Sequence, residues 1–350
     1  DLEQASSLCI ECRRLSFPDV RGVDEAQAAI ELTRNRPDAA LPLLMRHRDL
    51  IVNDAAMRPG PYRALIASLL MTGKVREAAA LERTNLETSD ASRGTWAQIA
   101  AMAPYERGLE AMSILEAAYP SDPASRAQLV GKWVAFHERH PNGRALERAR
   151  SLLPRSMPQP KDSSSRLAIV ARADIERVAG DFAAARATLQ SVIDSYPANI
   201  QDRAKLVRSL SGTDQQALFQ EIEPLLYARN NLAMLLVEED RSLDQALALV
   251  EQCIEIIPRN PDLRDTEAQV LLKLGRLSEA EQSSVMAIRA YPQNPSVLLT
   301  GAEILAASGR MEDAKQVLQR IRDIVAQEPW PSRQVENRLR RVTQVVDSQR

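Results

Sequence analysis

Ile257-Pro-Arg-Asn-Pro261 and Tyr291-Pro-Gln-Asn-Pro295 begin 34 residues apart in a chain of 350 residues. Three alanines, Ala246, Ala280 and Ala314, keep the same spacing of 34. A fixed spacing of turn residues and small residues is typical of stacked supersecondary units. The sequence therefore predicts that this part of the chain repeats one structural unit.

Each unit is predicted to contain two helices joined by a glycine turn. Asn260 is a candidate N-cap, and the proline after it has no N–H to leave unsatisfied at the first helical position. The first helix is expected to end at Gly275 and the second to begin at Ser278, with Glu281 completing a capping box. The same capping device is predicted one unit earlier. Because one helical hairpin cannot bury its apolar face alone, the units are expected to stack.

Three units in this register resemble the tetratricopeptide repeat (TPR) family, which places small residues, a turn glycine and a closing proline at fixed positions. The most complete unit supplies Ala268, Gly275, Ala280, Ala287 and Pro292. The flanking units match in part, through Ala233, Ala246, Cys253 and Pro258 before it, and Ala302, Gly309 and Ala314 after it, where Ile321 replaces the third small residue. A narrower similarity to bacterial members of the family rests on Asn230-Asn-Leu-Ala-Met-Leu-Leu236.

The resemblance implies an all-α solenoid of stacked helix–turn–helix repeats with a C-terminal capping helix. We expect degenerate helical repeats over 1–153, a Pro/Ser-rich loop or joint over 154–165, a TPR array over 166–328 and a capping helix over 331–348. In that last helix the apolar residues share one face, which suits a cap on the array or, alternatively, a coiled-coil partner. They are Val335, Leu339, Val342 and Val346.

Composition narrows the classes of partner. The net charge is −2, so no strong field favours nucleic acid. No apolar run approaches the roughly 20 residues that a membrane span needs. The chain starts at Asp1 rather than methionine, so the sequence does not determine the cellular compartment. The cytoplasm is slightly favoured, and a lost signal or membrane anchor is the alternative.

Catalytic chemistry has little support in the sequence. Cys9 and Cys12 form one CxxC pair, and His137 and His140 lie about 125 residues further on, too far apart in a solenoid to share a zinc ion. His47 is expected on a solvated helix face, and the three tryptophans are expected to be packing residues. We therefore predict no catalytic residue, no cofactor and no metal.

The resemblance implies a non-catalytic protein–protein interaction scaffold that binds a peptide or partner helix in the concave groove. By carry-over from the family, the groove residues are Asn230, Met234, Val237, Asp265, Gln269, Lys273, Leu299, Glu303 and Ala307. Asp265 and Glu303 favour a partner with apolar anchors and some basic residues.

One branch of the family binds two carboxylates through a clamp of Lys, Asn and Arg. Asn231 fits that clamp, but Asp262 and Thr266 stand where Lys and Arg are expected, so a clamp is disfavoured. Two other function classes stay open: the TPR half of a longer enzyme such as a glycosyltransferase, and a self-assembling structural protein, for which a homo-oligomer is possible.

Overall fold

The computed structural model describes residues 2–15, 19–55, 57–141, 143–154, 159–325 and 333–348. Within these ranges the secondary structure consists of twenty α-helices and one short 3-10 helix. The described residues fall into two compact units, an N-terminal unit up to Pro120 and a C-terminal unit from Ser121 onward. The helix-ending Phe17-Pro18, the loop proline Pro158 and residues 329–331, which include Trp330, lie outside the described residues.

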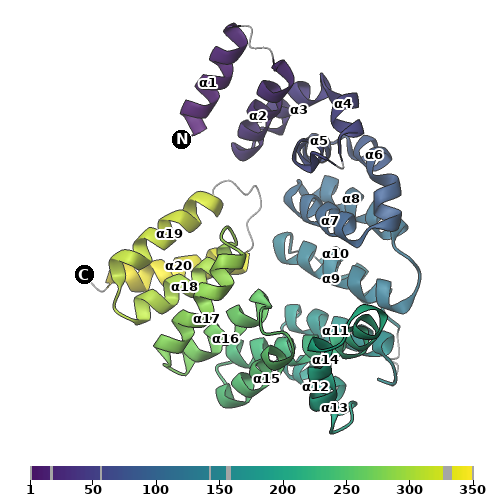
Figure 1. Cartoon of the computed structure of the whole chain (residues 1–350), viewed down its shortest axis with the longest axis vertical. Coiled ribbons are helices and arrows are strands. Elements are labelled where there is room, and N and C mark those ends of the chain that lie inside the picture. Colours follow the sequence, from purple (N-terminus) through teal and green to yellow (C-terminus); the bar gives the residue numbers. More distant parts are fainter. Residues whose placement is uncertain are drawn as a thin grey trace. The chain divides into compact units, whose positions relative to one another are not determined.

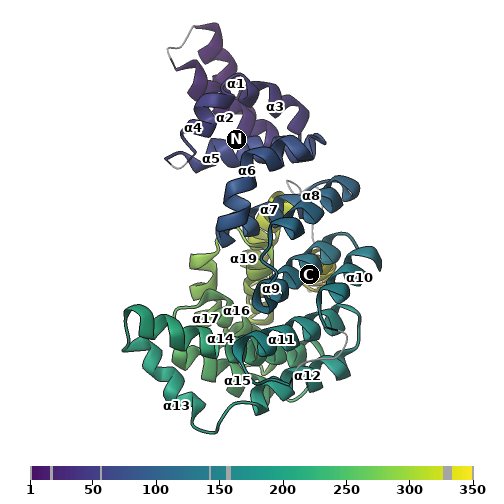
Figure 2. The same ribbon diagram turned by 90° about the vertical axis from the view of Figure 1, so that its right-hand side faces the viewer.

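The N-terminal unit contains eight helices, each packed against its neighbours along the chain (Figures 1 and 2). They are α1 (Leu2–Arg14), α2 (Val20–Thr33), α3 (Pro37–Met45), α4 (Arg48–Asn53), α5 (Pro59–Met71), α6 (Val75–Thr88), α7 (Asp90–Met102) and α8 (Tyr105–Ala118).

The C-terminal unit stacks helical hairpins and ends in a single helix (Figure 1). Its helices are α9 (Pro123–Arg139), α10 (Gly143–Leu152), α11 (Ser163–Val178), α12 (Phe182–Asp194), α13 (Ile200–Lys205), η1 (Leu206–Arg208), α14 (Gly212–Glu238), α15 (Leu243–Ile256), α16 (Pro261–Lys273), α17 (Leu277–Ala290), α18 (Pro295–Ala307), α19 (Met311–Val325) and α20 (Arg333–Ser348). Pairwise packing of α11·α12, α14·α15, α16·α17 and α18·α19 confirms the predicted all-α hairpin fold, and α20 packs on α18 and α19 as the predicted cap.

The N-caps of the first helices are those that the sequence predicts. The Asn260 side chain accepts hydrogen bonds from the backbone N–H groups of Asp262 and Leu263, at 2.9 and 3.1 Å. At the start of α18 the Asn294 side chain likewise accepts hydrogen bonds from the backbone N–H groups of Ser296 and Val297. Gly275 ends α16 with a φ of +74°, a left-handed conformation that glycine adopts without a Cβ clash.

The predicted capping boxes of the second helices are wrong. The backbone N–H of Arg276 bonds to the Leu271 carbonyl at 2.9 Å and closes the turn, so Arg276 itself is the N-cap of α17. Ser278 therefore already lies inside the first helical turn, and Arg276 reaches Glu279 instead. One unit earlier, Ser242 is the N-cap of α15 but adopts a left-handed φ of 46° and makes no side-chain cap bond.

The repeated alanines lie where the helices approach one another. Ala246, Ala280 and Ala314 are each 0% exposed. Ala280 stands on α17, which packs along α16. A larger side chain at such a contact would force the helices apart. The predicted repeat register thus places the small residues at the buried helix contacts.

Two helix boundaries differ from the prediction. Residues 198–226 are expected to form a separate short pair, but α14 runs without interruption for 27 residues and carries Pro224 inside it. The helix expected near 38–52 is instead two helices, α3 and α4. At their junction His47 Nε2 lies 3.0 Å from Asp24 Oδ2, and the histidine side chain is only 17% exposed. The expectation of a solvated His47 is therefore wrong, because α2 supplies a buried carboxylate that the local sequence does not reveal.

The Pro/Ser-rich segment 154–165 connects two helices of the same unit. Before it come α9 and α10, and its last residues, 163–165, are not loop as expected but form the first turn of α11, which packs directly against α9. The helices on either side of the segment therefore contact each other. The finer division of the chain into 1–153 and 166–328 stays a prediction.

Candidate functional site

The first helices of the three regular hairpins, α14, α16 and α18, pack side by side in the C-terminal unit. Six of the nine groove residues expected from the sequence line one cavity of about 660 Å³ on these helices. They are Met234, Val237, Gln269, Lys273, Glu303 and Ala307. Residues up to 73 positions apart are thus brought together as the resemblance implies. We call this cavity and its lining the A-helix groove.

Helix α20 forms one wall of the A-helix groove, which the sequence does not reveal. Val342 and Val346 are 5% and 2% exposed and belong to the core that α18 and α19 build. This anchoring turns Arg338, Arg341 and Val345 toward the cavity that the three first helices line. The amphipathic pattern of α20 predicts that its valines pack, but not which neighbouring helix its arginines face.

An ion pair joins α20 to the groove. Arg338 Nε and Nη2 lie 2.7 and 2.6 Å from the two carboxylate oxygens of Glu303. Arg338 Nη2 also donates to the Thr300 hydroxyl at 3.0 Å. Bidentate pairs of this kind are strong because two parallel hydrogen bonds carry the charge–charge attraction. Glu303 is therefore neutralised within the chain and is not a free acidic contact for a partner.

Asn230 and Asp265 are half-buried beside the cavity and do not line it. Asp265 Oδ2 accepts a hydrogen bond from Gln269 Nε2 at 2.8 Å. Burial raises the pKa of Asp265, because the charged carboxylate loses hydration. Asn230 Oδ1 and Asp265 Oδ1 are both buried and have no hydrogen-bond partner among the described residues. Their assignment to a partner-binding surface stays a prediction.

Leu299 does not belong to the groove. Its side chain is 0% exposed and packs in the core cluster with Ala302, Leu318 and Ile321. Leu299 precedes Glu303 by one turn on the same face of α18, but at that turn the face is covered by the core cluster to which α20 contributes Val342 and Val346. The carry-over from the family fails at this position, and substitution of Leu299 would test folding rather than binding.

The charges that line the groove are balanced rather than acidic. Lys273 Nζ lies 3.6 Å from Asp240 Oδ1, and both side chains are partly exposed. Arg341 is exposed and also lines the cavity, as does Glu238. With Glu303 held by Arg338, the expectation of an acidic groove with one opposing lysine is wrong, because it left out the arginines of α20.

The residues that occupy the clamp positions have other partners. Asn231 Nδ2 donates to Asp174 Oδ1 at 3.0 Å. Thr266 is 3% exposed, and its hydroxyl donates to the Asp262 carbonyl at 3.1 Å. No cationic side chain stands at either of the two non-matching positions, Asp262 and Thr266, so a clamp for two carboxylates stays disfavoured.

The other residues that the sequence singles out lie elsewhere. Cys9 and Cys12 are free thiols on α1, and burial raises the pKa of Cys9. Among the residues that the structure describes, no three His, Cys, Asp or Glu side chains gather as a metal site would need. Trp96 and Trp133 are each 1% exposed, which confirms that both are packing residues. No helix within the described ranges has the length and apolar character to span a bilayer.

No family model matches the sequence, and no curated protein sequence matches it. Among solved structures the chain is similar to yeast Tom70, with 14% identity and a TM-score of 0.38 over 100% of this chain and 86% of that one. It is also similar to the TPR domain of P58(IPK), with 16% identity and a TM-score of 0.29 over 100% and 99% of the two chains. A third similarity, to the Cut9–Hcn1 hetero-tetramer of the APC/C, has 12% identity and a TM-score of 0.44 over 91% and 55%.

These structural neighbours include TPR proteins, but each TM-score is below 0.5. The fold therefore rests on the chain's own helix packing, and no function is drawn from the neighbours. The narrower resemblance to bacterial members has no support from these comparisons.

Proposed function

We propose that this chain is a non-catalytic interaction scaffold that binds a segment of another protein in the A-helix groove. The observation that carries the proposal is the convergence of Met234, Gln269 and Glu303, from three successive hairpins, on one cavity of about 660 Å³. Cavities of roughly 300–1,000 Å³ with a few placed polar groups are typical binding sites. An extended or helical segment matches a trough that successive helices build.

The lining of the groove favours an apolar anchor flanked by an acidic residue. Met234, Leu272 and Val345 supply apolar surface from three helices. Arg341 is an exposed cation at the cavity, while Glu303 is already paired with Arg338 and Lys273 with Asp240. A carboxylate of the partner beside its apolar anchor would therefore meet a cation, so we propose an acidic rather than a basic residue at that place.

The same lining supports a role without catalysis. Among the described residues that line the groove there is no serine, cysteine or histidine that could act as a nucleophile or a general base. Glu303 and Lys273 are both engaged in ion pairs with residues of the chain itself. The groove can therefore recognise a partner segment through its shape, its apolar surface and its charged side chains.

Two methionines provide a matched test. Met234 is half-buried and lines the groove, whereas Met286 is 50% exposed on the second helix α17. We expect Met234→Glu to abolish capture of a partner by the purified chain, because a charge replaces the apolar anchor site. We expect Met286→Glu to leave capture unchanged. Circular dichroism establishes that both variants fold.

The opposite pattern would contradict the proposal. If the partner is retained by Met234→Glu and lost by Met286→Glu, the second-helix surface is the interface. Once a partner is identified, Arg341→Glu should slow its association and reduce the salt dependence of that rate if the partner segment is acidic.

A further inference from the structure

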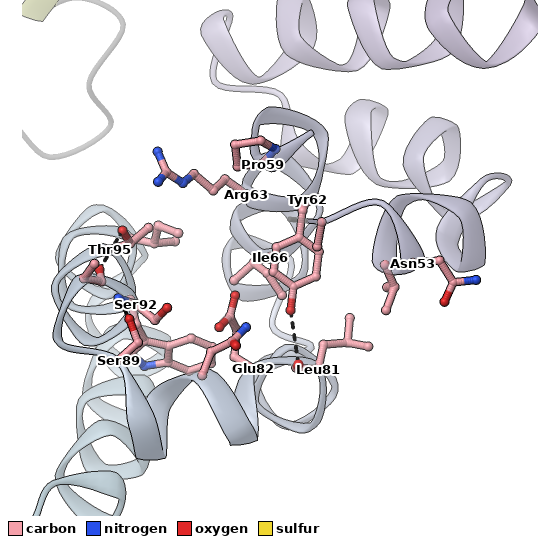
Figure 3. Close-up of a pocket in the computed structure, with 16 residues that line it drawn as sticks. Asn53, Pro59, Tyr62, Arg63, Ile66, Leu81, Glu82, Ser89, Ser92 and Thr95 are labelled. Atoms are coloured by element: carbon pink, nitrogen blue, oxygen red, sulfur yellow. Dashed lines mark hydrogen bonds between the residues drawn. The ribbon is translucent and has the colours of Figure 1, made fainter. Parts of the chain in front are cut away.

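A second cavity, of about 520 Å³, lies in the N-terminal unit between α5, α6 and α7 (Figure 3). It shares no residue with the A-helix groove, and the proposed function does not use it. Tyr62 and Ile66 of α5 and Trp96 of α7 give it apolar walls, and all three side chains are buried. Its volume is in the range of pockets that bind small molecules, so it has room for a long side chain together with part of the backbone that carries it.

Three hydrogen-bond donors of the cavity lining, on Tyr62, Thr95 and Trp96, are already committed to backbone carbonyls. The Tyr62 hydroxyl donates over 3.1 Å, the Thr95 hydroxyl over 3.0 Å and the Trp96 indole N–H over 2.8 Å. The acceptors are the carbonyl oxygens of Leu81, Ala91 and Ala111. What the hydroxyls and rings still offer to an occupant is therefore lone pairs and aromatic faces.

Glu82 of α6 adds a carboxylate to the same cavity. Its Oε2 atom is buried and has no hydrogen-bond partner among the described residues. Burial raises the pKa of Glu82, and nearby Asn85 and Tyr62 offset this in part. A buried carboxylate oxygen without a donor costs free energy, which a donor entering the cavity would recover.

We propose that this cavity receives the ammonium group of a lysine side chain carried by a partner polypeptide. An ammonium group has three donors and no acceptor, which complements Glu82 and the Thr95 oxygen. The aliphatic stem of a lysine packs along apolar walls such as Ile66 and the aromatic rings, while the rings also attract the cation. Asn85 is exposed at the cavity and hydrogen-bonds to Glu82, which leaves its amide oxygen for an N–H of the partner's backbone.

Among the described residues that line the cavity, Arg63 is the one cation, and it does not block this assignment. It is exposed, and Figure 3 shows its guanidinium directed away from the Glu82 carboxylate. Its charge lowers the pKa of Glu82 and so helps to keep the carboxylate ionised. The titratable groups that line the cavity are Tyr62, Arg63 and Glu82, and α7 contributes none.

The test follows the indole N–H resonance of Trp96 in the full chain by NMR. The probe is an acetyl-lysine methylamide, compared with the uncharged acetyl-norleucine methylamide and with n-butylammonium. We expect saturable shifts with the lysine probe, at least tenfold weaker binding of the norleucine probe, and weaker binding of n-butylammonium, which lacks amides. Glu82→Gln keeps the shape and should weaken the lysine probe about tenfold. Glu87 is exposed on the same helix, and Glu87→Gln should leave binding of the lysine probe unchanged.

Equal binding of the lysine and norleucine probes would overturn the proposal, and so would unchanged binding by Glu82→Gln. Equal binding of n-butylammonium would show that the occupant is not a polypeptide. If Glu82→Gln does not fold, the pH dependence of the wild-type chain provides the test. Protonation of Glu82 removes its charge as the pH falls through its raised pKa, while the lysine probe stays charged. Binding of the lysine probe must therefore weaken over that range. Met234→Glu should leave this site intact, which separates it from the A-helix groove.

Discussion

Arg338 of α20 and Glu303 of α18 form a bidentate ion pair, with N–O distances of 2.7 and 2.6 Å, that closes one side of the A-helix groove. Their side chains are 13% and 25% exposed, so the pair is shielded from much of the solvent. The pair fixes the C-terminal helix and also removes a negative charge from the partner-binding surface.

Arg338→Ala is expected to lower the free energy of unfolding by about 1.5–3 kcal/mol, because it leaves the Glu303 carboxylate partly buried without its partner. Arg340→Ala is the control. Arg340 is exposed and bonds to Asn337, its neighbour on the same helix, so its loss should cost less than about 0.5 kcal/mol. Urea unfolding of the three proteins measures both values. Identical unfolding curves for wild type and Arg338→Ala would show that the buried Val342 and Val346 keep α20 packed without the ion pair.

Ala280→Leu is expected to destabilise the chain by about 1–3 kcal/mol, because Ala280 is 0% exposed where α17 meets α16. Ala290 lies on the same helix but is exposed, so Ala290→Leu should leave the melting temperature within a degree or two of wild type. Thermal melts followed by circular dichroism compare the two. A melt of Ala280→Leu that coincides with wild type would contradict the repeat register.

Asp174 gives the C-terminal unit a pH dependence. Burial raises its pKa from 3.8 to about 6, and Arg177 opposes this while Glu138 adds to it. Between about pH 4 and pH 6 the folded chain therefore retains a proton that the unfolded chain releases, so the stability falls as pH rises through this window and stays lower above it.

Asp174→Asn cannot ionise and can still accept the hydrogen bond from Asn231. We expect it to match wild type near pH 4 and to be more stable above pH 6, by on the order of 3 kcal/mol, since one pKa unit corresponds to about 1.4 kcal/mol. Asp194→Asn, at an exposed position, should show no such divergence. Urea unfolding at a series of pH values tests this, and parallel curves for wild type and Asp174→Asn would refute it.

Local patterns were sufficient to predict the repeats but not the contacts between distant helices. The N-caps at Asn260 and Asn294, the glycine turn at Gly275 and the buried Ala280 follow from residues within one hairpin. The capping box at Ser278 failed because a turn bond at Arg276 moved the helix start.

For the groove, too, the local repeat pattern predicted some residues correctly and missed the contacts made by a distant helix. Met234 and Gln269 reached the groove because the repeat fixes which face of each first helix is concave. Leu299 failed because the core cluster that includes Val342 and Val346 of α20 covers its turn of α18. The pairing of Arg338 with Glu303 spans 35 residues and depends on where α20 docks, which no local pattern encodes.

The central claim is that a partner polypeptide lies in the A-helix groove, and site-specific photo-crosslinking tests it most directly. A photoreactive amino acid replaces Ala307, which is exposed and lines the groove, or Ala290, which is exposed on the second helix α17. The account predicts that the purified partner forms a covalent adduct through position 307 and none through position 290. An adduct through position 290 with none through position 307 would contradict it.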